Sequence, residues 1–166
     1  MILLLVRHGI AEDASPGGSD RDRRLTPRGR SRMRQVAAGL RRLKVRPAAI
    51  VTSPLPRAAE TAAIVAEVLG GHAEPRELDA LATGTTPAIA LRALRAVGGG
   101  DPLMVVGHEP TLSGLASLIL TGSPDALVID LRKGGVIVIE VEQLLPTRGA
   151  ALRSVLTPRQ LRAIAR

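Results

Sequence analysis

The sequence predicts an α/β protein, a three-layer α/β/α sandwich around a mostly parallel central sheet. Short apolar runs of the kind that form buried strands open the chain at 1–7 and return at 49–52 and 103–107. Helix-like segments lie between these runs, and strands that alternate with helices are typical of a parallel sheet covered on both faces. The 166 residues, 45% of them hydrophobic, are enough for one domain that spans 1–166.

Three Thr-Pro pairs mark the starts of predicted helices, at Thr26, Thr86 and Thr157. A threonine hydroxyl can cap the first backbone N–H groups of a helix, and proline is favoured at the first helical position. Helix-like spacing of apolar residues supports the same interpretation. In chain order, the predicted helices cover 27–43, 56–69, 87–97, 111–120 and a short terminal segment from 158.

The C-terminal third predicts a hairpin. Its arms are 126–131 and 136–141, joined by the turn 132–135, and the first arm alternates polar with apolar residues. The remaining predictions are a last strand at 151–156, a loop at 12–25, and an irregular segment at 72–84 with a short strand near Ala73.

Composition excludes several classes of function. The chain has no cysteine, which rules out disulfides, thiolate metal sites and thiol catalysis. Its net charge of +8 is compatible with nucleic acid, but the absence of Phe, Trp and Tyr removes the side chains that stack on bases. The apolar start is too short for a signal peptide, and no stretch reaches the ~20 apolar residues of a membrane helix. We therefore expect a cytoplasmic protein without nucleic-acid or membrane partners.

Polar residues that can carry chemistry follow three of the predicted strands. Arg7 and His8 follow the first, Ser53 and Arg57 the second, and His108 the third. The carboxyl ends of parallel strands lie along one edge of a sheet, so these side chains should share one crevice. Such a cationic crevice suits a phosphoryl group better than a metal ion, and we expect neither metal nor cofactor. An imidazole can attack phosphorus while guanidinium groups hold the phosphoryl oxygens.

These residues belong to four ordered sequence blocks, at 7–9, 25–29, 53–62 and 106–110. With these blocks the chain resembles the histidine phosphatase superfamily, also called the phosphoglycerate mutase-like family. Its short length and the Gly-His-Glu-Pro-Thr-Leu-Ser stretch from residue 107 look most like the compact SixA-type phosphohistidine phosphatases. The resemblance implies a phosphoglycerate mutase-like fold.

The resemblance also implies a role for individual residues. His8 would be the nucleophile that becomes phosphohistidine. Arg7 and Arg57 would clamp the phosphoryl oxygens, and His108 would be the fourth member of the pocket. Arg23 occupies the position of a substrate-facing arginine in many family members.

Several other polar residues allow more than one interpretation. Asp20 is expected to order the loop that carries Arg23. Ser53 either hydrogen-bonds near the phosphate or serves only as a turn residue. Longer family members use a carboxylic acid in the segment where this chain has Glu77 and Asp79, so these two are candidate general acids or plain loop carboxylates.

The predicted function is a metal-independent phosphatase with a covalent phosphohistidine intermediate. The favoured substrate is phosphohistidine on a protein, for example a His-phosphorylated signalling protein, because its imidazole leaving group needs little acid catalysis. Phosphate or sulfate should fit the same site. Two alternatives are a phosphomonoesterase for a small molecule such as a sugar phosphate, and a phosphate-binding module without activity.

The predicted first helix carries many arginines. This face is either simply solvated or a docking surface for an acidic phosphoprotein. Its members are Arg28, Arg30, Arg32, Arg34, Arg41 and Arg42.

Overall fold

The computed structural model describes residues 1–14, 18–98, 100–144 and 149–166 of the chain. Strands and helices alternate through most of it, and none of the described helices is long and apolar enough to cross a membrane. In order, the elements are β1 (Ile2–Arg7), η1 (Asp20–Asp22), α1 (Pro27–Arg42), β2 (Ala49–Thr52), α2 (Pro56–Leu69), β3 (Pro75–Glu77), η2 (Asp79–Leu81), α3 (Pro87–Val97), β4 (Leu103–Gly107), α4 (Thr111–Thr121), β5 (Val136–Val141), β6 (Ala150–Leu156) and α5 (Pro158–Ile164).

The strands form one six-stranded sheet in the order β3-β2-β4-β1-β5-β6. The first four in this order run parallel, while β5 is antiparallel to both β1 and β6. Arg7 lies level with Gly107, and Thr52 lies level with Val106. The carboxyl ends of β1, β2 and β4 are therefore neighbours at one edge of the sheet, and the predicted fold class is confirmed.

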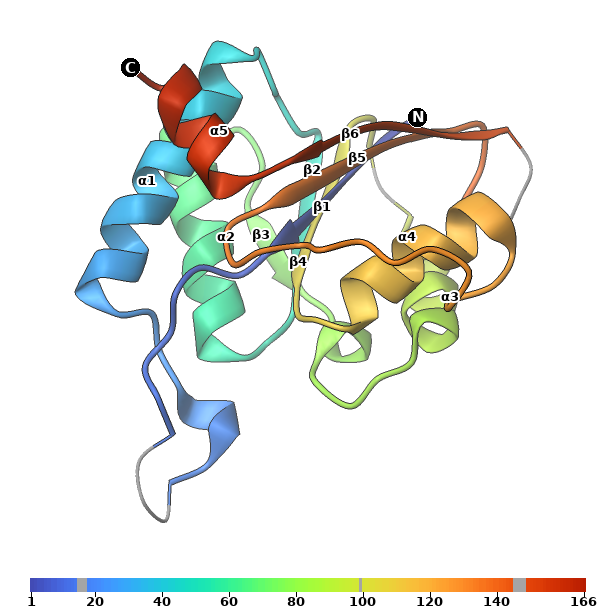
Figure 1. Cartoon of the computed structure of the whole chain (residues 1–166), viewed down its shortest axis with the longest axis horizontal. Helices are drawn as coiled ribbons and strands as arrows, with labels where there is room; N and C mark the ends of the chain where they lie inside the picture. Colours follow the sequence, from blue (N-terminus) through green and yellow to red (C-terminus); the bar gives the residue numbers. More distant parts are fainter. Residues whose placement is uncertain (15–17, 99, 145–148) are drawn as a thin grey trace.

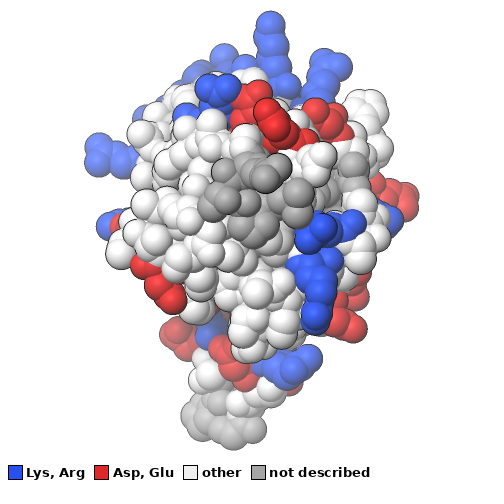
Figure 2. All heavy atoms as spheres, turned by 90° about the vertical axis from the view of Figure 1, so that its right-hand side faces the viewer, with Lys and Arg blue, Asp and Glu red and all other residues white. Residues whose placement is uncertain are grey.

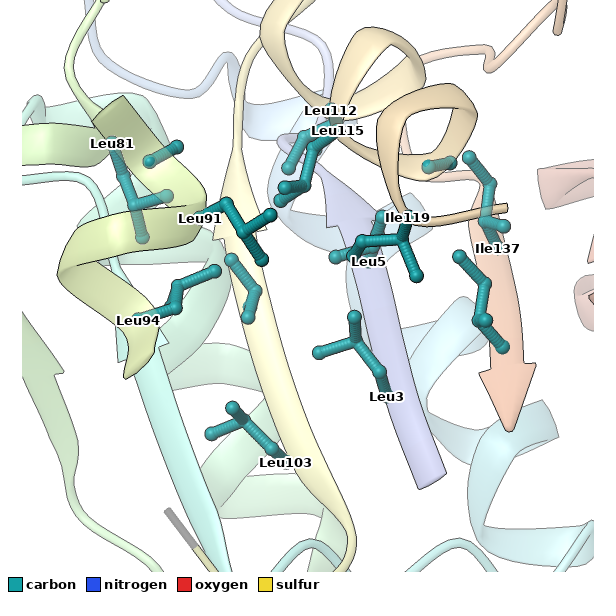
Figure 3. Packing of buried hydrophobic residues seen from close by; sticks show 14 of the residues in the cluster. Leu3, Leu5, Leu81, Leu91, Leu94, Leu103, Leu112, Leu115, Ile119 and Ile137 are labelled. Atoms are coloured by element: carbon teal, nitrogen blue, oxygen red, sulfur yellow. The ribbon is translucent and has the colours of Figure 1, made fainter. Parts of the chain in front are cut away.

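Helices cover both faces of this sheet, with α1, α2 and α5 on one side and α3 and α4 on the other (Figure 1). Alternation along β1 distributes its side chains between the two layers: Leu3 and Leu5 enter one core cluster, and Leu4 and Val6 the other. Figure 3 shows Leu3 and Leu5 on the same face as Leu115 of α4. Because the chain has no aromatic residues, both layers are filled by aliphatic side chains and methionine.

The three predicted helix starts are confirmed. The hydroxyls of Thr26, Thr86 and Thr157 each accept a hydrogen bond from the backbone N–H three residues later, and a proline follows each of them. At Thr157 the side chain of Gln160 returns the bond and completes a capping box.

The prediction of a hairpin arm at 126–131 is wrong. This segment forms no strand, and the side chain of Val128 is fully exposed. β5 pairs with β1 on one edge and with β6 on the other, so no edge remains for a further partner. The alternation that suggested a strand reflects a surface segment packed only in part against the core.

The two segments predicted to be irregular, 72–84 and 12–25, also contain short elements of regular structure. The short strand expected near Ala73 lies slightly later, at β3, where it pairs with β2. The predicted loop 12–25 contains η1 and is closed by a bridge between Ala11 and Leu25, while its residues 15–17 lie outside the described part.

Candidate active site

His8 is the first residue after β1, and the backbone around it is held from two directions. Its N–H donates to the carbonyl of Gly107 on the neighbouring strand (3.1 Å). The N–H of Gly134 donates to the carbonyls of both Arg7 (3.0 Å) and His8 (3.1 Å). The side chain is 5% exposed, so the imidazole is fixed at the carboxyl edge of the sheet and largely removed from water.

The protonation of His8 follows from its surroundings. Its Nδ1 lies 2.7 Å from the carbonyl oxygen of Gly9, which can only accept, so Nδ1 carries the proton. Burial lowers the pKa of His8 to about 3, and the neighbouring His108 ring and the guanidinium charges of Arg57 and Arg7 act in the same direction. The ring is therefore neutral at pH 7, and its Nε2 holds an unprotonated lone pair.

Gly9 lies in a crowded place where a side chain would not fit. A Cβ at this position would lie 2.6 Å from Cγ of Met33. The N–H of Gly9 donates to Oγ1 of Thr61 (3.1 Å), and that hydroxyl donates to the carbonyl of Arg57 (2.7 Å). Thr61 thus connects the end of β1 to the first turns of α2.

His108 is the first residue after β4, and its ring lies beside that of His8. The two ring centroids are 5.0 Å apart with an interplanar angle of 56°. Nε2 of His108 and Oγ of Ser53, the first residue after β2, are hydrogen-bonded at 2.8 Å. The N–H of Leu55 donates to the same hydroxyl oxygen (3.2 Å). Nδ1 of His108 is buried and has no hydrogen-bond partner among the described residues.

Burial also governs the charge of His108, whose side chain is 2% exposed. Desolvation and the nearby charge of Arg57 lower its pKa to about 4. Both imidazoles are thus neutral at pH 7. Because Arg7 and Arg57 lower the pKa values of both rings, all four predicted residues lie within one electrostatic neighbourhood.

Arg57, on the first turn of α2, is 3% exposed and is held by Asp20. Its Nη1 donates to the carbonyl of Asp20 (2.7 Å), and its Nη2 pairs with the carboxylate (2.9 Å). The same carboxylate binds Nη1 of Arg23 at 2.6 Å, and Nε of Arg23 donates to the carbonyl of Glu12 (2.6 Å). Asp20 therefore anchors its loop to the site and brings Arg23 beside Arg57.

Arg7 lies partly exposed at the end of β1. Its Nη1 donates to the carbonyl of Leu131 (2.8 Å), and its Nε is buried without a partner among the described residues. The segment that the sequence assigned to a hairpin arm thus supplies a carbonyl that orients this guanidinium.

The two candidate acids lie on the neighbouring edge strand. Glu77 ends β3 and Asp79 begins η2, and both side chains are exposed. Neither forms a hydrogen bond or ion pair with the two histidines in the described structure. The structure thus does not bring them into the histidine cluster.

A different carboxyl group adjoins the cluster. Glu109 directly follows His108, is half-buried, and accepts hydrogen bonds from Oγ (2.5 Å) and N (3.1 Å) of Ser113. Burial raises the pKa of Glu109, although the two bonds from Ser113 oppose the rise. The sequence identifies Glu109 only as a member of the block 106–110 and assigns it no role of its own.

Three further groups at the site were not predicted from the sequence: the hydroxyl of Thr61 and the carbonyls of Gly9 and Leu131. Thr61 follows Arg57 by one helical turn, and this spacing could have identified it. The carbonyls of Gly9 and Leu131 have no sequence signal, since every residue has a carbonyl. Nowhere in the described ranges do three or more His, Asp or Glu side chains form a group that could hold a metal ion.

Comparison with known proteins places this arrangement in a family. Residues 3–82 match the sequence profile of the histidine phosphatase superfamily (branch 1). An uncharacterized protein of Picosynechococcus sp. is 38% identical over 140 residues, which cover 82% of this chain and 83% of the relative. The chain belongs to the histidine phosphatase superfamily, and it is a phosphatase.

Solved structures share the fold over nearly the whole chain. One of SixA from Agrobacterium tumefaciens has a TM-score of 0.78 at 22% identity, covering 95% of this chain and 97% of that one. A protein histidine phosphatase SixA with tungstate gives 0.78 at 23% identity, covering 97% and 99%. A mycobacterial glucosyl-3-phosphoglycerate phosphatase gives 0.70 at 18% identity, covering 94% and 99%.

Proposed function

We propose that this phosphatase works through a covalent phosphohistidine on His8 and that its substrate is phosphohistidine on a partner protein. The observation that carries the proposal is the 2.7 Å bond between Nδ1 of His8 and the carbonyl of Gly9. It directs the lone pair of a neutral, buried imidazole out through Nε2, within a cluster that also contains Arg7, Arg57 and His108.

The first chemical step transfers the phosphoryl group to His8. Nε2 attacks phosphorus and forms a P–N bond, while the bond from phosphorus to the leaving imidazole breaks and its electron pair returns to that nitrogen. Arg7 and Arg57 balance the charge on the phosphoryl oxygens. His108 faces the same group, and Ser53 fixes its ring through Nε2.

The second step releases phosphate. The oxygen of a water molecule attacks phosphorus and gives its proton to solvent, and the P–Nε2 bond breaks. Its electron pair returns to Nε2, so His8 regains the neutral form in which Nδ1 donates to Gly9. The fixed tautomer of His8 thus serves both steps.

The choice of substrate class rests on the leaving group. No carboxyl group in the described structure hydrogen-bonds either imidazole. A positioned general acid typically contributes ~10²–10⁴-fold to rate, so this site favours leaving groups that do not need one. The imidazole of phosphohistidine is such a leaving group, because its second nitrogen can already carry a proton and the ring then leaves as a neutral molecule. The alkoxide of a phosphate ester has no second site for a proton and needs a general acid.

A small-molecule phosphomonoesterase is the second candidate. Glu77 and Asp79 lie at the carboxyl end of β3, beside β2, which ends immediately before Ser53. A bound ester could meet one of these carboxyl groups as a proton donor. The shared fold with a glucosyl-3-phosphoglycerate phosphatase supports this alternative.

The decisive experiment compares kcat/KM for a phosphohistidine peptide and for a sugar phosphate. We expect the peptide to be preferred by at least tenfold, turnover to be lost in His8→Asn, and Glu77→Gln and Asp79→Asn to retain peptide turnover. A preference for the ester that disappears in one of the two carboxyl variants would establish the second candidate. Phosphate binding without turnover of either substrate would indicate a binding module.

A further inference from the structure

A second cationic feature of the molecule lies outside the histidine cluster, at the end that carries α1 and α5. It is a groove of about 760 Å³, which we call the basic groove. Its lining residues are Arg7, Ile10, Arg32, Asp130, Arg132, Lys133, Thr157, Pro158, Arg159 and Arg162.

The cations of the basic groove come from segments far apart in sequence. Arg32 belongs to α1, Arg132 and Lys133 to the turn before β5, and Arg159 and Arg162 to α5. The fold brings them together because α5 packs tightly on α1. A Cβ at Gly39 of α1 would lie only 2.1 Å from the carbonyl oxygen of Leu161.

Positive charge in the basic groove is poorly balanced. Its one acidic lining residue, Asp130, pairs with Arg132 at 3.0 Å. No ion pair within the described ranges involves Arg32, Lys133, Arg159 or Arg162. Desolvation and the charges of Arg28 and Arg162 lower the pKa of Arg32, which is the expected effect of crowded like charges.

Other arginines of α1 differ in this respect. Arg30 pairs with Glu60 (2.7 Å), and Arg34 pairs with Glu67 (2.8 Å), so these two are neutralised against α2. The arginine-rich helix face is therefore divided: one part serves the packing of α1 on α2, and Arg32 faces the basic groove. The opposite end of the molecule, around α3 and α4, shows charges of both signs scattered among many uncharged residues (Figure 2).

The basic groove adjoins the candidate active site. Arg7 lines the groove and is also one of the four residues of the histidine cluster. The turn that carries Lys133 continues into Gly134, whose N–H binds the carbonyls of Arg7 and His8. A ligand in the groove would therefore lie next to a phosphoryl group on His8.

The size and chemistry of the groove define its occupant. Its volume exceeds what a single phosphate needs, and the five arginines and one lysine around it suit a chain of several anionic groups, such as carboxylates. The protein has no aromatic side chain on which a base could stack, which disfavours single-stranded nucleic acid. An acidic polypeptide segment fits these requirements best.

We propose that the basic groove binds an acidic segment of the phosphoprotein substrate, next to the phosphohistidine that enters the active site. The proposal rests on the proposed function and deepens it, since it assigns the choice of partner to a surface separate from the catalytic residues. The groove should act mainly on association and KM, because charge complementarity raises encounter rates by roughly 10–10³-fold and weakens with salt.

The test uses Arg32→Glu/Arg159→Glu, with Arg92→Glu/Arg95→Glu on exposed α3 positions as the control of equal charge change. Substrates are a phosphohistidine peptide flanked by acidic residues, the same peptide with neutral flanks, and free phosphohistidine. At low salt we expect the groove variant to lose roughly tenfold or more in kcat/KM on the acidic peptide, through KM, and to keep its activity on free phosphohistidine. The control should keep both activities.

Several outcomes would overturn the proposal. The first is an equal loss of kcat/KM in the control variant. The second is an equal loss of kcat/KM by the groove variant on the acidic and the neutral peptide, and the third is no loss of kcat/KM in the groove variant. Far-UV circular dichroism checks folding, and Arg32→Gln/Arg159→Gln should give an intermediate loss if the double glutamate variant is unfolded.

A binding assay separates this proposal from the proposed function. Titration with a labelled, unphosphorylated acidic peptide should show binding to the wild type that salt and the groove substitutions weaken, even if phosphohistidine is not turned over. Retention of an oligonucleotide in place of the peptide, lost in the same variants, would assign the groove to nucleic acid instead.

Discussion

Two neutral imidazoles lie side by side in this molecule, and burial keeps both of them uncharged. For His8 the neutral form is useful, because only an unprotonated nitrogen can attack phosphorus. The carbonyl of Gly9 decides which nitrogen that is. His108 is held in turn by Ser53 through Nε2, while its Nδ1 is buried without a hydrogen-bond partner among the described residues.

These pKa values predict a steep dependence of stability on pH. Both folded-state pKa values, about 3 for His8 and about 4 for His108, lie below the ordinary histidine value of 6.5. As pH falls below about 6.5, the unfolded chain therefore binds more protons than the folded protein does. The stability contributed by the neutral rings is lost progressively, down to about pH 4 for His108 and about pH 3 for His8. We expect the free energy of unfolding to fall by about 1.4 kcal/mol per histidine per pH unit there.

Urea unfolding followed by circular dichroism at a series of pH values measures this slope. His108→Asn should reduce this slope by the share of one histidine. An unaltered slope in His108→Asn would mean that His108 is charged in the folded protein.

The side chains of the site could be predicted from the sequence more completely than the groups that hydrogen-bond to them. Arg7, His8, Arg57 and His108 could be predicted because each follows a recognisable strand end or helix start. The bonds that orient them come largely from backbone carbonyls, at Gly9, Asp20 and Leu131, and depend on how loops fold back on the sheet. Such loop paths have no periodic pattern from which they could be read.

At the scale of elements, the site depends on three parallel strands that end side by side. Each strand is followed directly by a residue of the site: β1 by His8, β2 by Ser53 and β4 by His108. The sequence predicted these strands because they are short, apolar and followed by helices. It erred at 126–131, where alternation suggested a strand although both edges of β5 were already occupied by β1 and β6. Edge occupancy is a property of the whole sheet and is not visible in a local pattern.

The contact between α1 and α5 gives a prediction for Gly39. Alanine is the better helix former by about 1 kcal/mol, so the substitution would stabilise an isolated helix. Here its Cβ would overlap the backbone of Leu161, and we expect a net loss of about 1–3 kcal/mol. Differential scanning calorimetry measures the effect, with Ser31→Ala, an exposed position of the same helix, as the control. A higher melting temperature for Gly39→Ala would show that the two helices are less tightly packed.

At the scale of the whole molecule, the two core layers share one sheet and should unfold together. Leu5 lies fully buried in the layer under α3 and α4, and Leu40 lies fully buried in the layer under α1, α2 and α5. We expect Leu5→Ala and Leu40→Ala each to cost about 2–5 kcal/mol, in a single transition. Leu127→Ala, on a partly exposed loop, should cost about 0.5 kcal/mol or less.

Because the chain has no aromatic residues, calorimetry and far-UV circular dichroism are the suitable probes of this transition. Two separate transitions, with each substitution shifting only one, would show that the layers are independent.

Charge is also organised at this largest scale. Arg30 and Arg34 pair with acidic residues of α2, and the cationic cluster around the two neutral histidines lies at the carboxyl edge of the sheet. The basic groove beside it is lined by Arg32, Arg159 and Arg162, which form no ion pair within the described ranges. A net charge of +8 alone could not reveal this arrangement. It follows from the way α5 and the turn before β5 fold against α1.

Nε2 of His8 is proposed to carry the phosphoryl group during turnover. The most direct measurement is rapid quenching of the enzyme with a phosphorylated substrate, followed by peptide mapping and ³¹P NMR of the phosphoenzyme. We expect one acid-labile phosphoryl group, on Nε2 of His8. Phosphate on His108 or on Nδ1 of His8, or steady turnover by His8→Asn, would contradict it.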